Sequence, residues 1–405
     1  MAPDRPLVLC MVGLPARGKS YIARKIVQYL QWMGVQATVF NVGSYRRERL
    51  GSGQSADFFD PGNPSGASAR GDMAEAALRD LLSWLGPGRV AVYDATNVGR
   101  GRRDRLRARC ADAAADVVFI ESVCNDEELV DANIRQTKLR SPDYAGVAES
   151  EAIADFRARI AHYERAWEPV DAADGSFVRL TDVGRRVEVH EVSGWLPSRL
   201  VFLLMNLHVT PRSIWLTRHG ESEWNAAGRI GGDSGLTASG FAYGDRLARW
   251  LPEAVDCSPE LWTSTLLRTR QTAAALPAHW PRRALRSLDE IDAGACDGMT
   301  YEEIETHMPH VATGRSADKL RFRYPSGESY EDVIARLEPA IVDLERMRGP
   351  VVVVAHQAVL RALYAYFTGR PAAETPHLSV PLHTVIRLTP SAYGCDELRT
   401  APGDD

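Results

Sequence analysis

The chain has 405 residues, more than one hydrophobic core usually serves, so two domains are expected. Its 45% hydrophobic and 25% charged residues exclude a disordered or collagen-like chain. The net charge of -5 gives no general reason to expect a nucleic acid or a membrane as partner, and no run approaches the roughly 20 apolar residues of a membrane helix. Six cysteines without CxxC pairs or metal spacing indicate reduced thiols in a cytoplasmic protein.

The first half alternates between predicted strands and helices, which is typical of a parallel sheet covered on both faces. It begins with a continuous apolar run at residues 7–12, a predicted buried strand, followed by helical periodicity over residues 21–32. Residues 51–69 are rich in Gly, Ser and Pro and predict a mobile loop. Further strands are predicted at 35–41, 89–93 and 117–123, and further helix at 75–85 and, with a break at 141–143, over 127–167.

A new strand at residues 213–217 follows Thr210-Pro211-Arg212, and we expect the domain boundary there. The predicted domains are residues 1–210 and 211–405. The second half repeats the alternation, with strands also predicted at 261–264 and 350–355 and helices near 238–251 and 330–347.

A phosphate-binding loop is predicted at residues 13–20, where Gly-Leu-Pro-Ala-Arg-Gly-Lys-Ser fits GxxxxGK[ST] between a strand and a helix. Its glycines allow backbone N–H groups to surround phosphate oxygens at a helix N-terminus. Lys19 is expected to contact the β- and γ-phosphates of a nucleotide, and Ser20 to ligate Mg²⁺. The other residues expected around the phosphates are Gly13, Leu14, Pro15, Ala16, Arg17 and Gly18.

Asp94 follows the strand at 89–93, where a carboxylate could hold the Mg²⁺ shell or orient an acceptor hydroxyl. A lone Asp at a strand end is usually a helix cap, and the phosphate loop is what favours the functional interpretation. Arginines at 46–47 and 100–105 could clamp an anionic acceptor, although arginine runs on helices are more often solvated faces.

The second half carries an Arg-His-Gly triplet at the end of its first predicted strand. A neutral His219 can attack phosphorus and carry the phosphoryl group, while Arg218 and Arg268 would balance the developing charge. His356 follows the apolar run 351–355, so two strand-end histidines could flank one phosphate. Glu290 could protonate the leaving alkoxide. One such histidine is most often structural, but this combination favours a phosphate-removing site.

Two independent sets of motifs resemble one family, the bifunctional 6-phosphofructo-2-kinase/fructose-2,6-bisphosphatases, over nearly the whole chain. The first half is similar in GLPARGKS, FNVGSYRRE, YDATN, KLRSPDY and DFRARIAHYE. The second half is similar in LTRHGESEWN, GRIGGDSGLTASG, EIDAGACDGMTYEEI, RYPSGESYEDVIARLEP, AHQAVLRAL and PLHTVIRLTP. The resemblance implies a P-loop kinase-like parallel sheet with helices on both faces, followed by a histidine-phosphatase, phosphoglycerate-mutase-like α/β domain.

For the first half, the resemblance implies that ATP with Mg²⁺ phosphorylates the 2-hydroxyl of fructose 6-phosphate. Lys19, Ser20 and Asp94 would act on the transferring phosphoryl group, with Asn133 and Lys138 bordering the nucleotide. The residues implied to bind the sugar phosphate are Arg46, Arg70, Thr96, Arg102, Lys138, Arg159 and Tyr163.

For the second half, the resemblance implies that fructose 2,6-bisphosphate loses its 2-phosphate without a cofactor. His219 would be the nucleophile, Glu290 the proton donor, and Arg218, Arg268 and His356 the phosphate clamp. Asn225 and Gly231 would line the same pocket. The residues implied to hold the sugar and its 6-phosphate are Tyr301, Arg315, Lys319, Tyr330, Gln357 and Arg361, of which Arg315 and Lys319 fall in a segment expected to be a loop.

Three functional hypotheses follow, and the resemblance adds a possible homodimer. In the first, both halves are active. In the second, one half is active and the other is a nucleotide- or sugar-phosphate-binding regulatory module; retention of Lys19, Asp94, His219, Glu290 and His356 argues against it. The third is a nucleic-acid end-processing kinase-phosphatase, against which the acidic net charge argues.

Overall fold

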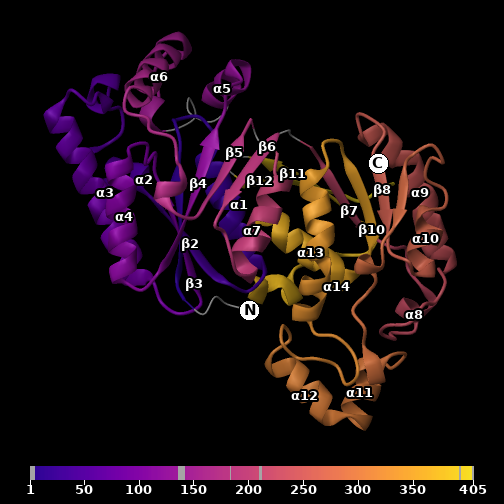
Figure 1. Cartoon of the computed structure of the whole chain (residues 1–405). Helices are drawn as coiled ribbons and strands as arrows, with labels where there is room; N and C mark the ends of the chain where they lie inside the picture. The colour runs from indigo at the N-terminus through magenta and orange to yellow at the C-terminus, as the bar shows by residue number, and fades with distance from the viewer. Residues whose placement is uncertain (1–4, 136–141, 183, 209–211, 392–393, 404–405) are drawn as a thin grey trace. The chain divides into compact units, whose positions relative to one another are not determined.

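The computed structural model describes residues 5–135, 142–182, 184–208, 212–391 and 394–403. The chain forms two compact units, one of Met1–Leu30 and Val35–His208, the other of Gln31–Gly34 and Val209–Asp405 (Figure 1). Within the described ranges, no helix is long and apolar enough to cross a membrane. Residues 210 and 211, between which the boundary is predicted, lie outside the described part, so this boundary stays a prediction.

The first unit is built on a six-stranded sheet in the order β2-β3-β1-β4-β5-β6. Its strands are β1 (Leu7–Val12), β2 (Gln36–Asn41), β3 (Arg89–Asp94), β4 (Asp116–Val123), β5 (Phe177–Thr181) and β6 (Arg186–His190). All neighbouring strands are parallel except β5 and β6. The central strand β1 is buried along its whole length, as its uninterrupted apolar sequence predicts.

Helices cover both faces of this sheet (Figure 1). They are α1 (Lys19–Trp32), α2 (Val42–Leu50), α3 (Pro64–Trp84), α4 (Arg100–Asp112), α5 (Glu127–Asn133), α6 (Glu149–Glu164) and α7 (Trp195–Asn206), with 3-10 turns η1 (Ala56–Phe59), η3 (Pro142–Tyr144) and η4 (Ala172–Asp174). Val8, Cys10 and Val12 of β1 pack in one core with Leu81 of α3 and Leu106 of α4. Alternate residues of a strand point to one face, so α3 and α4 lie on the same face of the sheet.

Two predictions for the first unit are wrong in detail. Residues 51–69 are not one loop, because η1 and the first turns of α3 lie within them. Helix α3 begins at Pro64 with Asn63 as its N-cap, accepting from Gly66 N–H, and this start signal was read as loop composition. The antiparallel strand β6 makes the sheet mixed at one edge, where an all-parallel sheet was expected.

The second unit has its own six-stranded sheet in the order β12-β11-β7-β10-β8-β9. Its strands are β7 (Ile214–Arg218), β8 (Glu260–Thr263), β9 (Arg282–Ala284), β10 (Val351–Ala355), β11 (Val385–Ser391) and β12 (Gly394–Thr400). Strands β7, β10, β8 and β9 are parallel, whereas β11 is antiparallel to both of its neighbours. Parallel pairing brings the C-terminal ends of β7 and β10 to one edge, where His219 and His356 follow them.

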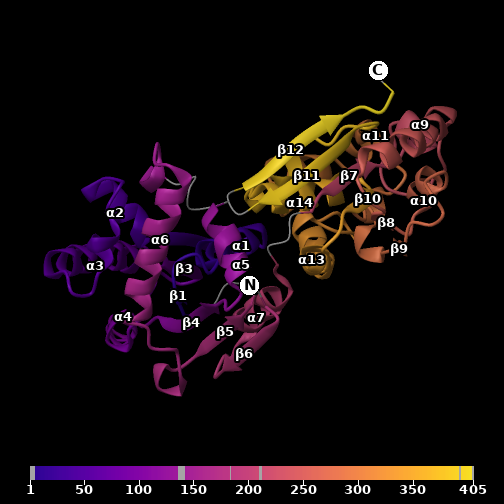
Figure 2. The same cartoon turned by 90° about the horizontal axis from the view of Figure 1, so that it is seen from above.

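Helices α9 and α10 lie on one side of this sheet and α13 and α14 on the other (Figures 1 and 2). The helices are α8 (Glu223–Ala226), α9 (Ala238–Ala254), α10 (Leu267–Ala273), α11 (Tyr301–His307), α12 (Pro309–Ala317), α13 (Tyr330–Arg346) and α14 (Gln357–Thr368), with 3-10 turns η5 (Arg286–Leu288), η6 (Gly294–Cys296) and η7 (Ala372–His377). Tyr243 and Leu247 of α9 pack with Val352 and Val354 of β10. The predicted α/β class with two domains is therefore confirmed.

Candidate functional site

The predicted phosphate loop connects β1 to α1 with backbone geometry that requires glycine. Gly13 has φ +133°, and a Cβ there would lie 2.4 Å from the Ser122 carbonyl oxygen. Gly18 has φ +81°. Lys19 and Ser20 form the first turn of α1, and Lys19 Nζ donates to the Leu14 carbonyl at 2.6 Å. The lysine is thus folded over the loop that it is expected to serve.

Asp94 ends β3 directly opposite Asn41, the last residue of β2. Its carboxylate is buried, at 4% exposure, and Oδ2 accepts from Asn41 Nδ2 at 2.5 Å. Asn41 Oδ1 in turn accepts from Ser44 N–H as the N-cap of α2. Because the cap uses the oxygen of the amide, its nitrogen faces Asp94 and fixes that carboxylate.

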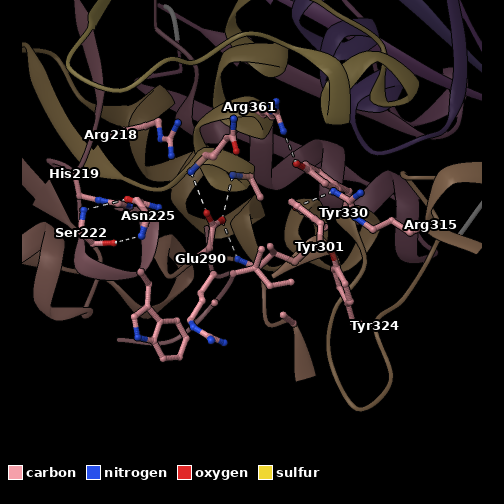
Figure 3. Close-up of a pocket in the computed structure, with 18 of the residues that line it drawn as sticks. Arg218, His219, Ser222, Asn225, Glu290, Tyr301, Arg315, Tyr324, Tyr330 and Arg361 are labelled. Atoms are coloured by element: carbon pink, nitrogen blue, oxygen red, sulfur yellow. Dashed lines mark hydrogen bonds between the residues drawn. The ribbon is translucent and has the colours of Figure 1, made fainter. Parts of the chain in front are cut away.

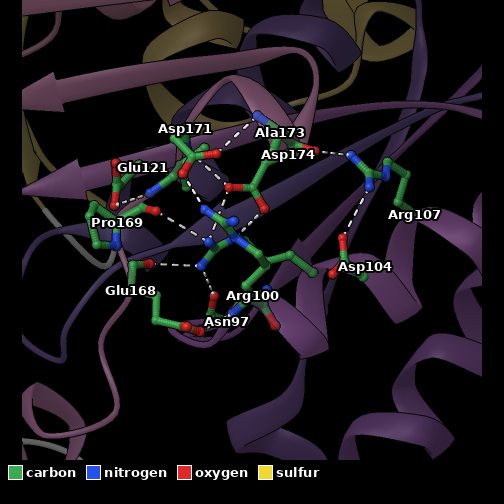
Figure 4. Close-up of polar contacts among 12 residues, drawn as sticks. Asn97, Arg100, Asp104, Arg107, Glu121, Glu168, Pro169, Asp171, Ala173 and Asp174 are labelled. Atoms are coloured by element: carbon green, nitrogen blue, oxygen red, sulfur yellow. Dashed lines mark hydrogen bonds and ion pairs between the residues drawn. The ribbon is translucent and has the colours of Figure 1, made fainter.

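The segment after Asp94 is anchored by Arg103, which is fully buried. Asn97, Glu168 and Asp174, which surround this place, are labelled in Figure 4. Arg103 donates to both carboxylate oxygens of Asp174, at 2.7 and 3.0 Å, and to the Val98 and Glu168 carbonyls. Each contact satisfies a buried polar group, as removal from water requires. The Thr96 carbonyl accepts from Gly13 N–H at 2.9 Å, so the same segment also supports the phosphate loop.

The arginines expected to bind the sugar phosphate come from four different elements. Arg46 of α2 is buried and pairs with Asp143 at 2.5 Å. Arg70 of α3 donates to the Phe58 carbonyl, and burial lowers the pKa of its guanidinium. Arg159 of α6 is half-buried with its Nε atom fully covered, and its pKa is lowered by desolvation and by the charge of Arg46.

The remaining predicted residues of this group are less closely defined. Arg102 of α4 is half-buried. Its charge acts to lower the pKa of both Arg70 and Tyr93, so it lies close to these two side chains. Tyr163 lies one turn beyond Arg159 on α6. Lys138 lies outside the described residues.

A cavity of about 400 Å³ lies beside the phosphate loop. Leu14 and Arg17 of the loop line it together with Cys124 and residues of α5 and α6. Asn133 of α5 donates to the Ala16 carbonyl at 3.2 Å, so it borders the loop as expected. The arginines at 46, 70 and 159 are not part of this cavity's lining.

In the second unit, one guanidinium joins the two predicted histidines. Arg268 Nε donates to His219 Nε2 at 3.1 Å and to His356 Nδ1 at 3.2 Å. The other nitrogens of the histidines contact Gly220 O, 2.6 Å from His219 Nδ1, and Ser264 Oγ, 2.7 Å from His356 Nε2. These contacts are consistent with His219 protonated at Nδ1, leaving the Nε2 lone pair toward Arg268.

Both histidines are held neutral by their surroundings. Burial, and after it the charge of Arg268, lower the pKa of His219 to about 3. The pKa of His356, which is fully buried, is lowered for the same two reasons. A neutral imidazole is the form that can act as a nucleophile.

Glu290 faces the N-terminus of α14. Its Oε1 accepts from Ile291 and Ala358 N–H at 3.0 and 3.1 Å, and its Oε2 accepts from Gln357 N–H at 3.1 Å. Three backbone donors fix the carboxylate where the first turn of a helix offers free N–H groups.

A cavity of about 360 Å³ opens between these groups and the segment of α11 and α12 (Figure 3). The predicted residues that line it are Arg218, His219, Asn225, Gly231, Arg268, Glu290, Tyr301, Arg315, Lys319, Tyr330, Gln357 and Arg361. Every predicted phosphatase residue except His356 is thus in one lining, and His356 contacts it through Arg268.

The far wall of this cavity is basic and aromatic. Arg315 Nη2 donates to Tyr301 Oη at 3.0 Å, and Arg361 Nη1 donates to Tyr330 Oη at 3.0 Å. Burial and the neighbouring arginines lower the pKa of Lys319 to about 8. Arg315 lies on α12 and not in a loop, because Pro309 at the N1 position starts a helix that composition did not predict.

The sequence interpretation missed several residues of this cavity. Ser222, which forms a reciprocal cap on α8 with the predicted Asn225, was not predicted, nor were Trp224 and Tyr324, which add aromatic lining. All three stand in motifs that carry the family resemblance, and membership in those motifs was the available signal. The Ser264 contact to His356 spans 92 positions, and local pattern could not reveal it.

Comparison with known families finds one family model in each half of the chain. Residues 2–211 match the family model of 6-phosphofructo-2-kinase, and residues 214–401 match that of the histidine phosphatase superfamily (branch 1).

Curated relatives match both halves at once. A 6-phosphofructo-2-kinase/fructose-2,6-bisphosphatase of Arabidopsis thaliana is 48% identical over 98% of this chain, which spans 54% of that relative's length. One of Caenorhabditis elegans is 46% identical over 96% of the chain and 88% of its own length. The 6-phosphofructo-2-kinase/fructose-2,6-bisphosphatase 1 of Rattus norvegicus is 48% identical over 97% of this chain and 83% of its own length. The chain therefore belongs to the bifunctional 6-phosphofructo-2-kinase/fructose-2,6-bisphosphatase family.

Proposed function

We propose that both halves are active, the first making fructose 2,6-bisphosphate from ATP and fructose 6-phosphate and the second returning it to fructose 6-phosphate and phosphate. The observation that carries this proposal is the pair of neutral histidines joined by Arg268 at the wall of a basic cavity. A phosphate-binding loop in the other unit supplies the opposite reaction.

The phosphatase reaction starts with attack of His219 Nε2 on the phosphorus of the 2-phosphate. The bond between phosphorus and the C2 oxygen breaks, and Glu290 gives the leaving alkoxide a proton. Water then attacks the phosphohistidine, the P–N bond breaks, and the Glu290 carboxylate takes the water's proton. Arg218 and Arg268 balance the charge on the transferring phosphoryl group in both steps.

In the kinase reaction, the 2-hydroxyl oxygen of fructose 6-phosphate attacks the γ-phosphorus of ATP, the bond to the β–γ bridging oxygen breaks, ADP leaves, and the hydroxyl proton is released to water. Such a transfer depends mainly on positioning and on positive charge. Lys19 and the backbone N–H groups of the loop hold the phosphates, and the arginines at 46, 70, 102 and 159 hold the acceptor. Thr96 and Tyr163 complete the acceptor site.

Mg²⁺ fits this site on the chemistry of its donors. Ser20 and Asp94 supply a hydroxyl and a fixed carboxylate, and Mg²⁺ is usually held by one or two such ligands together with phosphate oxygens and water. The parts of the chain that are described contain no cluster of three or more His, Cys, Asp or Glu side chains that could hold a metal alone. When bound, Mg²⁺ neutralises phosphate charge during transfer.

The covalent step can be tested directly. Chain mixed with fructose 2,6-bisphosphate labelled at the 2-phosphate and quenched in base should carry an acid-labile, base-stable label. The label should be absent from His219→Ala and present in His279→Ala, because His279 is exposed and outside the cavity lining. An unlabelled wild-type chain that still releases phosphate would rule out the phosphohistidine.

The kinase reaction needs a separate assay. With labelled ATP, Mg²⁺ and fructose 6-phosphate, His219→Ala should accumulate an acid-labile fructose bisphosphate, because this variant no longer hydrolyses the product. No product under any Mg²⁺ condition would leave the first unit a binding module.

A further inference from the structure

Phe59 contacts two of the four arginines that are expected to bind the sugar phosphate in the first unit, Arg46 and Arg159. It is the last residue of η1 and is 3% exposed. The guanidinium carbon of Arg159 lies 3.4 Å from the centroid of its ring, and that of Arg46 lies 5.5 Å away. The ring of Tyr163 is 6.2 Å from that of Phe59, tilted by 41°. Three residues expected to bind the sugar phosphate thus meet on one aromatic side chain.

Two of these residues keep unused hydrogen-bond donors. Arg159 Nε and Arg46 Nη1 are buried, and neither has a hydrogen-bond partner among the described residues. Buried donors are normally paired, because an unpaired one costs the free energy of its lost hydration. Oxyanions of a bound ligand would supply the missing partners.

The arrangement also brings two cations together away from water. Asp143 offsets the charge of Arg46, whereas within the described ranges Arg159 forms no ion pair with a carboxylate. A carboxylate at Arg159 would occupy the donors that a phosphate needs. An aromatic face attracts a guanidinium through its quadrupole without using any N–H group, so it stabilises the cation and leaves its donors available.

We infer that Phe59 is a positioning residue that holds the Arg46 and Arg159 guanidiniums in place for an anionic sugar phosphate. This inference rests on the proposed kinase function. It makes Phe59 a determinant of the affinity for the acceptor, fructose 6-phosphate. Phe59 touches neither reacting atom, so its effect is on acceptor binding and not on phosphoryl transfer.

The test compares Phe59→Leu with Phe177→Leu in the full chain. Phe177 is a matched control, because it is also 3% exposed and has an arginine, Arg179, 5.3 Å from its ring centroid, but that arginine is bonded to Glu121 and Glu188. Phe59→Leu should raise the KM for fructose 6-phosphate by about tenfold or more, the size of a desolvated cation–π contact, with the KM for ATP unchanged. Phe59→Met fills similar space without an aromatic quadrupole, so it should raise the KM for fructose 6-phosphate in the same way. It replaces Phe59→Leu in the comparison if the Leu variant does not fold.

Equal KM values for fructose 6-phosphate in the Phe59 variants and in Phe177→Leu would overturn the inference, as would an equal rise in the KM for ATP. If the wild-type chain has no kinase turnover, the proposed function fails instead. Calorimetric titration with fructose 6-phosphate then decides the inference: the affinity of one binding event should fall about tenfold or more in Phe59→Leu and stay unchanged in Phe177→Leu, and an unchanged affinity in both would refute the role of Phe59.

Discussion

Arg268 donates through one nitrogen to His219 and to His356, and through Nη1 to the Gly232 carbonyl at 2.6 Å. A guanidinium can make these contacts together because its donors form a rigid planar fork. A lysine in its place would keep the positive charge, but its single ammonium group could not contact both imidazoles and the Gly232 carbonyl in the same geometry.

Arg268→Lys should therefore lower kcat of the phosphatase reaction by about 100-fold, the loss typical of one preorganised charge-stabilising donor, with kinase activity unchanged. The control is Arg282→Lys, since Arg282 also makes a fork of bonds, to the Ala273 and Leu276 carbonyls, but lies outside the cavity. Phosphate release measured at saturating substrate gives the comparison. Equal rates in the two variants would show that charge alone is sufficient at position 268.

For single residues, the sequence supports predictions where the residue stands in a local motif. It does not support them where the residue's role depends on a contact with a part of the chain far away in the sequence. Lys19 and His219 were found because a strand and a glycine stand beside them. Phe59 and Ser264 were not found, because their partners are 100 and 92 positions away at Arg159 and His356. Pairing across such separations depends on the packing of whole elements.

The loop between α8 and α9 carries Gly231, whose conformation depends on having no side chain. Gly231 has φ +75°, and a Cβ there would lie 1.6 Å from Asp297 Oδ1. Asp297 Oδ1 also accepts from Gly232 N–H, so it cannot move away without breaking that bond. The loop presents both its own lining residue and the Gly232 carbonyl that binds Arg268.

Gly231→Ala should reduce phosphatase kcat/KM at least tenfold while leaving kinase activity intact. Gly228→Ala is the matched control, because Gly228 has a similar φ of +68° but open space around its Cα. Both variants share the cost of a left-handed alanine, about 1 to 2 kcal/mol, so their difference isolates the clash with Asp297. A similar loss of activity in both would assign the effect to backbone strain alone.

Among the elements, strands and helices with strong periodicity were predicted well, as β1 and β10 show by their full burial. The β5–β6 hairpin was missed because its strands are five residues each and β6 is only partly buried, so its pattern is weak. Its antiparallel direction follows from the few residues that separate the two strands in the sequence and not from any apolar period.

At the scale of the whole molecule, the buried histidines link the stability of the second unit to pH. The pKa of His219 is about 3 in the folded chain, whereas an unfolded histidine has a pKa of about 6.5. Above pH 6.5, His219 is neutral in both the folded and the unfolded chain. Between about pH 6.5 and 3 only the unfolded state takes up the proton, so stability falls as the pH falls through this window.

His219→Asn should therefore make the loss of unfolding free energy on acidification shallower, by up to about 1.4 kcal/mol per pH unit. The exposed His279→Asn should leave the slope unchanged. Denaturant unfolding at several pH values between 7 and 4 measures the slopes. The same slope in wild type and His219→Asn would contradict the lowered pKa.

We propose that one chain carries two opposing active centres, one that makes and one that hydrolyses fructose 2,6-bisphosphate. The most direct test measures formation and hydrolysis of fructose 2,6-bisphosphate on one preparation each of the wild type, Lys19→Met and His219→Ala. We predict both activities in the wild type, hydrolysis alone in Lys19→Met, and synthesis alone in His219→Ala. Loss of both activities in either variant, or only one activity in the wild type, would contradict the account.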